Sequence, residues 1–177
     1  MATRADSTEP APTVWRDITE LYHQVLDLYY GRGQRAKAFP LALRLLRLLH
    51  KHDPDANTLL GMSGRWLVAE LDGDLEDTIR YRERELNALR QHIASGLIEN
   101  GGLVADEFAD RLDLLASSYL DAKRYDDALT CLIESERFCA DRGIAFDGKA
   151  IRADVKRAMR RRKPAAVGDG GTPASAR

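Results

Sequence analysis

Hydrophobic residues recur along this chain at intervals of three and four positions, the spacing of one face of an α-helix. No stretch alternates apolar and polar residues over more than a few positions, so strands are not expected. Glycine or proline interrupts most of the apolar stripes, as is typical of helix ends. The pattern predicts an all-α protein with seven helices, whose apolar stripes span residues 14–29, 38–49, 57–71, 75–93, 108–119, 125–139 and 151–159.

The two ends of the chain differ in composition from the middle. Residues 1–12 and 164–177 are rich in Pro, Gly, Ala and Ser and have almost no large apolar side chains. Such segments cannot bury enough apolar surface to offset the entropy lost on ordering. We therefore expect disordered tails at 1–12 and 164–177, and one helical-repeat domain at 13–163.

An internal unit is clearest in the last third of this domain. Leu115, Ala116 and Tyr119 form a Leu-small pair followed by an aromatic, and Tyr125 and Ala128 occupy the next helix. This arrangement resembles the tetratricopeptide repeat. The resemblance implies three antiparallel helix hairpins in a right-handed superhelical array, with the last helix as a C-terminal cap. The corresponding turns at Gly33, Gly73 and Lys123 are 40 and 50 residues apart, longer than the usual period of about 34.

The same resemblance implies a partner-binding groove lined by the first helix of each hairpin. Mapped onto this chain by register, the groove would be acidic and would suit a basic segment of another protein. Tyr30, Trp66 and Leu67 would be its apolar anchors. The full predicted set is Glu20, His23, Asp27, Tyr30, Ser63, Leu67, Glu70, Asp110, Asp113, Ser117 and Asp121.

Charge, hydropathy and cysteine spacing together limit where the protein can act. There are 27 Lys+Arg and 28 Asp+Glu among 177 residues, a formal net charge of −1. No apolar run is long enough to span a membrane, and the start lacks the apolar region of a signal peptide. Two cysteines eight positions apart on one helix are too distant for a disulfide. These observations predict a cytoplasmic protein that does not bind membranes.

No set of residues points to catalysis, a metal or a cofactor. His50 and His52 are two positions apart and do not share a helix face, and no third ligand stands at a helical spacing. A Ser-His-acid or Cys-His arrangement cannot be assembled either. We therefore expect no catalytic residues, no metal site and no cofactor.

A run of cations closes the last predicted helix and gives an alternative function. Such a run can hold phosphates or an acidic partner, although a solvated helix end with cations at its negative pole gives the same pattern. The patch comprises Lys156, Arg157, Arg160, Arg161, Arg162 and Lys163.

Taken together, the sequence predicts a non-enzymatic protein–protein interaction adaptor. Two alternatives stay open: a nucleic-acid-associated regulator that uses the basic helix, and an accessory subunit of an enzyme complex. Self-association is a further alternative, because Trp15 near the start of the first helix could be poorly covered.

Overall fold

The computed structural model describes residues 12–96 and 103–161. Both predicted tails lie outside these ranges, apart from Pro12, where the first helix begins. All seven predicted helices are confirmed, and no strand occurs in the described ranges. In chain order the elements are α1 (Pro12–Leu26), a π-helical turn η1 (Asp27–Gly31), α2 (Arg35–His52), α3 (Leu59–Asp72), α4 (Leu75–Ala94), α5 (Leu103–Asp121), α6 (Tyr125–Arg142) and α7 (Lys149–Arg161).

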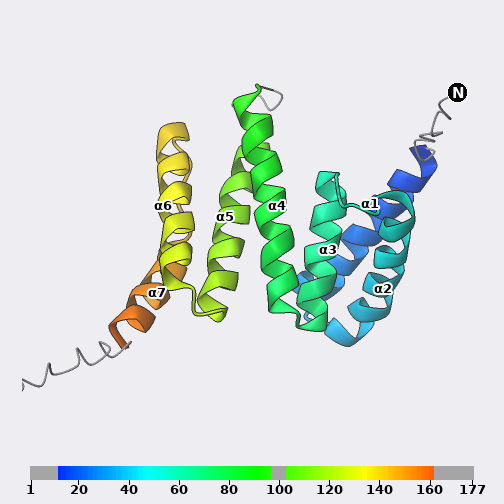
Figure 1. Ribbon diagram of the computed structural model, residues 1–177, viewed down its shortest axis with the longest axis horizontal. Helices are drawn as coiled ribbons and strands as arrows, with labels where there is room; N and C mark the ends of the chain where they lie inside the picture. Colours follow the sequence, from blue (N-terminus) through cyan, green and yellow to red (C-terminus); the bar gives the residue numbers. More distant parts are fainter. Residues whose placement is uncertain (1–11, 97–102, 162–177) are drawn as a thin grey trace, which may run out of the picture.

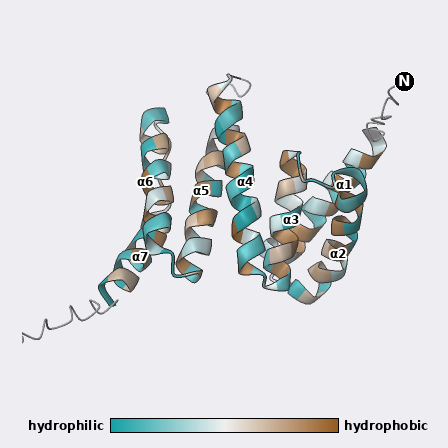
Figure 2. Cartoon of the chain, in the orientation of Figure 1, coloured by the Kyte–Doolittle hydropathy of each residue, from teal (hydrophilic) through white to brown (hydrophobic). Residues whose placement is uncertain are grey.

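The helices form an elongated row (Figure 1). One end consists of α1 and α2, the middle of α3, α4 and α5, and the other end of α6 and α7. Hydrophilic residues dominate the face of α4 seen in Figure 2. None of the described helices is both long enough and apolar enough to cross a bilayer. The described helices thus form an open row with α1 and α2 at one end and α6 and α7 at the other.

The apolar core is divided into two clusters. The first joins α1, α2 and α3 through side chains such as Ile18, Leu45 and Leu71. The second joins α4, α5, α6 and α7 and includes the fully buried Leu112 of α5 and Val155 of α7. The boundary between the clusters runs along the packed helices α3, α4 and α5, where polar side chains are concentrated.

Small residues occupy buried positions in the helix packing, among them Ala116 and Ala128 of the repeat pattern. Both are fully buried. Gly64 of α3 lies so near α2 that a Cβ atom there would be 2.5 Å from Cδ1 of Leu49. Ridges of one helix can enter grooves of another this closely only where a side chain is small or missing.

The turns that follow η1, α3 and α5 share one backbone feature. Gly33, Gly73 and Lys123 have φ values of 63°, 89° and 60°, in the left-handed region. Glycine adopts this conformation without steric cost, whereas Lys123 is a less common occupant. The three positions that the sequence marks as corresponding turns are thus alike in conformation.

Candidate binding pocket

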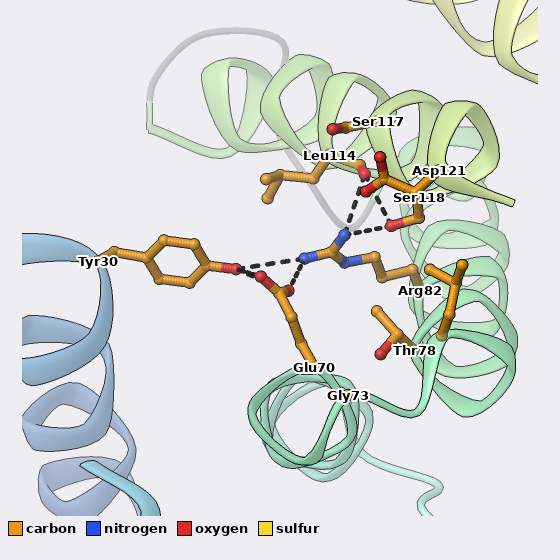
Figure 3. Close-up of a pocket in the computed structure, with 10 residues that line it drawn as sticks. Tyr30, Glu70, Gly73, Thr78, Arg82, Leu114, Ser117, Ser118 and Asp121 are labelled. Carbon is orange, nitrogen blue, oxygen red and sulfur yellow. Dashed lines mark hydrogen bonds and ion pairs between the residues drawn. The ribbon is translucent and has the colours of Figure 1, made fainter. Parts of the chain in front are cut away.

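A polar pocket of about 260 Å³ lies between η1, α3, α4 and α5, at the boundary of the two apolar clusters. Figure 3 shows side chains from all four elements converging on it. We call it the central pocket; it is lined by Tyr30, Glu70, Gly73, Leu75, Thr78, Arg82, Leu114, Ser117, Ser118 and Asp121.

The π-helical turn η1 brings two adjacent tyrosines to Glu70, and one of them, Tyr30, lines the pocket. The hydroxyl of Tyr30 donates to both carboxylate oxygens of Glu70 at 2.7 Å, and the hydroxyl of Tyr29 donates to Oε1 at 3.3 Å. Neighbouring residues of a regular α-helix point in directions about 100° apart, so two adjacent side chains rarely reach one group. The rings are 4.6 Å apart between centroids, and both reach a single carboxylate from the widened turn.

Arg82 of α4 is the residue that joins the walls of the central pocket. Its Nη2 forms an ion pair with Glu70 and donates to the Tyr30 hydroxyl at 3.3 Å. Its Nη1 donates to the Leu114 carbonyl at 3.0 Å and to the Ser118 hydroxyl. One buried guanidinium therefore links η1, α3 and α5 (Figure 3).

A second polar cluster lies deeper, around Glu85 of α4. Trp66 donates its Nε1 hydrogen to Glu85 Oε2 at 2.8 Å, Ser63 donates to Oε1, and Arg111 Nε lies 3.2 Å from Oε1. The guanidinium groups of Arg82 and Arg111 both lie over the Trp66 ring, at 4.5 and 5.5 Å from its centroid. Cations over an indole are attracted by its π-electrons, so Trp66 connects the two clusters.

Burial dominates the electrostatics of both clusters. It raises the pKa of Glu85 above the ordinary carboxyl range, although Arg111, Ser63 and Trp66 act in the opposite direction. The pKa of Tyr30 is also raised, first by burial and then by its hydrogen bond to Glu70. The Tyr30 hydroxyl is therefore a hydrogen-bond donor at physiological pH and not a phenolate.

The raised pKa of Glu85 predicts a pH dependence of stability. The folded state holds this proton more firmly than the unfolded state, so folding becomes less favourable as pH rises from the ordinary glutamate pKa of 4.5 through the raised value. Relative to the parent, Glu85→Gln should gain stability across this interval, and urea unfolding at a series of pH values measures the difference. A difference that stays constant with pH would contradict the prediction. Asp113→Asn should show the same kind of pH dependence relative to the parent, because burial raises the pKa of Asp113 as well.

Four of the eleven predicted groove residues come together in the central pocket: Tyr30, Glu70, Ser117 and Asp121. Ser63 and Leu67 do not lie on an exposed face. Both are buried, Leu67 completely, because every residue of α3 from 61 to 69 is buried. The expectation that Trp66 and Leu67 are accessible anchors is therefore wrong.

The remaining predicted groove residues are dispersed. Asp27 pairs with Arg32 at 2.7 Å, His23 is exposed beside the Tyr22 ring, and Glu20 lines a different groove between α1 and α2. Asp110 is exposed. Asp113 is partly buried and lies near Ser135, Asp147 and Arg152, which places it toward α6 and α7.

The expected acidic wall is also incomplete. The predicted groove positions include no cation, but Arg82 pairs with Glu70 at the pocket, and Arg111 pairs with Glu85 in the deeper cluster. A signal for this was present: Arg82 follows Ile79 by three positions and precedes Leu86 by four, so it interrupts an apolar stripe at helical spacing. A charged residue at such a position is buried only when it is paired.

The predicted basic patch is partly described. Lys156, Arg157, Arg160 and Arg161 are exposed on α7, and Arg157 pairs with Asp154 at 3.1 Å. Arg162 and Lys163 lie outside the described residues. Val155 anchors α7 from the opposite face and is fully buried.

No group of three or more His, Cys, Asp or Glu suited to a metal ion occurs among residues 12–96 and 103–161. Cys131 and Cys139 are both buried, as expected of thiols that act as small hydrophobic side chains. Burial raises the pKa of the Cys131 thiol to about 12, so its reactive thiolate is scarce at neutral pH.

Comparisons of the chain with protein-family models, with curated proteins and with solved structures give no match. The class of protein therefore follows from the structure alone. It is an all-helical protein of packed adjacent helices, compatible with a helical-repeat fold, with a polar pocket at the boundary of its two apolar clusters.

Proposed function

We propose that this chain is a non-enzymatic adaptor that binds a basic segment of another protein at the central pocket. The observation that carries the proposal is that an exposed aromatic ring and an exposed carboxylate both line this pocket. The Tyr30 side chain is 48% exposed although its hydroxyl is fixed, and Asp121 is exposed at the end of α5.

These two groups suit the side chain of a lysine or arginine. A cation can stack on the Tyr30 ring and pair with Asp121. The pocket also adjoins the C-terminal ends of α3 and α5, whose last carbonyls carry partial negative charge. Its volume of about 260 Å³ is below the usual range of small-molecule sites, which begins at about 300 Å³, and favours one inserted side chain.

The hydrogen-bond network beneath the pocket favours binding over catalysis. Glu70 is already paired with Arg82 and accepts from both tyrosines, so its charge is compensated before any ligand arrives. Such a fixed arrangement lowers the cost of ordering an interface. An accessory subunit of an enzyme complex would use the same pocket, with the enzyme as the partner.

The resemblance to tetratricopeptide repeats supports the same proposal. The shared left-handed turns at Gly33, Gly73 and Lys123, and the small residues Gly64 and Ala128 at buried positions, are features expected of a helix-hairpin array. In that architecture, first helices line the inner face that receives ligands. We accordingly propose three hairpins, α1–α2, α3–α4 and α5–α6, with α7 as the cap.

A second candidate function rests on α7. Its outward face carries Lys156, Arg160 and Arg161, all exposed, and such a stripe can contact the phosphates of a nucleic acid. This binding would be independent of sequence and would weaken steeply with salt.

The proposal is tested with three fluorescent probes: a short arginine-containing peptide, its glutamate counterpart and a DNA duplex. We expect the arginine peptide to bind. Asp121→Lys should slow its association by at least about tenfold at low salt, because the charge that attracts it is reversed. Asp126→Lys is the matched control, since Asp126 is also exposed but lies on α6 and does not line the pocket.

Three outcomes separate the candidates. Loss of peptide binding in Asp121→Lys alone supports the central pocket. Equal binding by both variants and the parent would remove the pocket as the site. Binding of the duplex with a steep salt dependence, and of neither peptide, would favour α7 instead.

A further inference from the structure

The end of the row formed by α1 and α2 carries a groove that no other part of the described structure covers. Its volume is about 460 Å³, and Leu21 and Leu48 contribute to its floor. It is lined by residues of α1 and α2, whereas Leu46 on another face of α2 lines a separate pocket together with Arg65 and Val68 of α3. We call it the end groove.

Charges of opposite sign are separated across the end groove. Its α1 side carries Asp17 and Glu20, and its α2 side carries Arg44 and Lys51. The separation extends along α2, which has no acidic residue between Arg35 and His52. All four of these charged side chains are exposed.

These four charges take almost no part in ion pairs within the described residues. Among the described residues, Asp17, Arg44 and Lys51 form no ion pair, and the nearest cation to Glu20 is Arg16, at 3.9 Å between two largely exposed side chains. A contact of that kind contributes little to stability. The acidic and basic sides thus face solvent across an apolar floor, and each offers the charge that the other would attract.

We propose that the end groove binds the end groove of a second copy of this chain, forming a two-fold symmetric dimer. With the two-fold axis parallel to the helices and between them, each α1 lies over the α2 of the other copy. A two-fold interface uses the same patch twice, so it must be self-complementary. Acidic and basic sides then meet at both halves of the interface.

The antiparallel course proposed for α1 and α2 gives the pairing within this dimer. The start of α1 is level with the end of α2, so Asp17 of one copy meets Lys51 of the other, and Glu20 meets Arg44. The other two-fold arrangement, with its axis across the helices, places α1 on α1 and sets carboxylate against carboxylate. Like charges across an interface are strongly unfavourable, which selects the first arrangement.

The test is sedimentation velocity of the full chain over a range of concentrations, with two charge-reversed variants. One carries Asp17→Lys and Glu20→Lys, and the other carries Arg44→Glu and Lys51→Glu. We expect the parent to dimerise and each variant alone to dissociate at least about a hundredfold more readily, because like charges then face each other. An equimolar mixture of the two variants should form a heterodimer, since opposite charges meet again.

All four substituted residues are exposed, so the variants should fold like the parent, and circular dichroism of each variant checks this. A parent that is monomeric at all concentrations would overturn the proposal. So would a dimer that both variants preserve, or a mixture that does not associate. Duplex binding by a monomeric parent that Arg44→Glu with Lys51→Glu abolishes would instead assign the basic side to nucleic acid.

This inference does not depend on the function proposed for the central pocket. Asp121→Lys should leave the dimer intact, and the charge reversals on α1 and α2 should leave binding of the arginine peptide intact. Failure of one proposal can therefore be distinguished from failure of the other.

Discussion

Replacement of Arg82 by Met is expected to lower the free energy of unfolding by about 3–5 kcal/mol, the usual cost of removing one partner of a buried ion pair. The guanidinium is the cation that pairs with Glu70 and the donor that satisfies the Leu114 carbonyl. Methionine fills much of the space but leaves both groups without this donor. Because Arg82 links η1, α3 and α5, the loss should weaken packing between the two apolar clusters. Urea unfolding followed by circular dichroism measures it.

The same helix supplies the control. Arg80→Met removes an arginine two positions away that is mostly exposed, pairs with Asp77 at 2.8 Å and lies 4.9 Å from the centroid of the Tyr81 ring, so it should cost little. A double variant, Arg82→Met with Glu70→Leu, removes both charges of the buried pair. It should be more stable than Arg82→Met alone, because no uncompensated carboxylate remains. Equal midpoints for Arg80→Met and Arg82→Met would show that Arg82 does not join the helices as described.

The helices themselves could be predicted from the sequence because their ends are encoded locally. Asp74 precedes α4, and its carboxylate accepts from the Asp77 amide at 3.0 Å. Gly73 and Gly143 end α3 and α6 in left-handed conformations. Such signals depend only on neighbouring residues. Apolar spacing, capping residues and glycines are therefore sufficient to predict where these helices begin and end.

The candidate site could be predicted only in part, because burial of α3 depends on distant helices. Register alone placed Ser63 and Leu67 on an exposed face, yet α2 and α4 pack on α3 from different sides. A helix that is apolar nearly all round is expected to be buried. From Leu59 to Ala69, α3 contains one charged residue, Arg65, and that composition was the available signal.

The central pocket had a further component that no local pattern indicates. The π-helical turn at Asp27–Gly31 brings Tyr29 and Tyr30 to one carboxylate, and a regular helix continued from α1 would separate them. Sequence reasoning placed Tyr30 and Glu70 on the same groove through register. Arg82 belongs to α4, which the register does not place on the groove; its position in the apolar stripe of α4 indicates a paired, buried charge but not the pocket that it joins.

Trp66→Ala should be as costly as Arg82→Met, at about 3–5 kcal/mol of unfolding free energy. The side chain is only 1% exposed, so its removal leaves a cavity between the two polar clusters. It also removes the indole donor from Glu85 and the ring over which two guanidinium groups lie. A side chain that served as an accessible anchor for a partner would behave differently, since its loss would reduce binding and leave stability unchanged.

Trp66→Phe separates the contribution of packing from that of the hydrogen bond. Phenylalanine retains an aromatic ring but cannot donate to Glu85 Oε2, and an unsatisfied buried acceptor costs about 1–3 kcal/mol. The phenylalanine variant should therefore unfold between the parent and Trp66→Ala in urea. The difference in unfolding free energy between the parent and Trp66→Phe should shrink at low pH. Burial raises the pKa of Glu85, and a protonated carboxyl needs fewer hydrogen-bond donors than a carboxylate. If this free-energy difference is the same at all pH values, the indole N–H does not stabilise the charged form of Glu85. Trp66 would then stabilise the boundary between the two apolar clusters by packing alone.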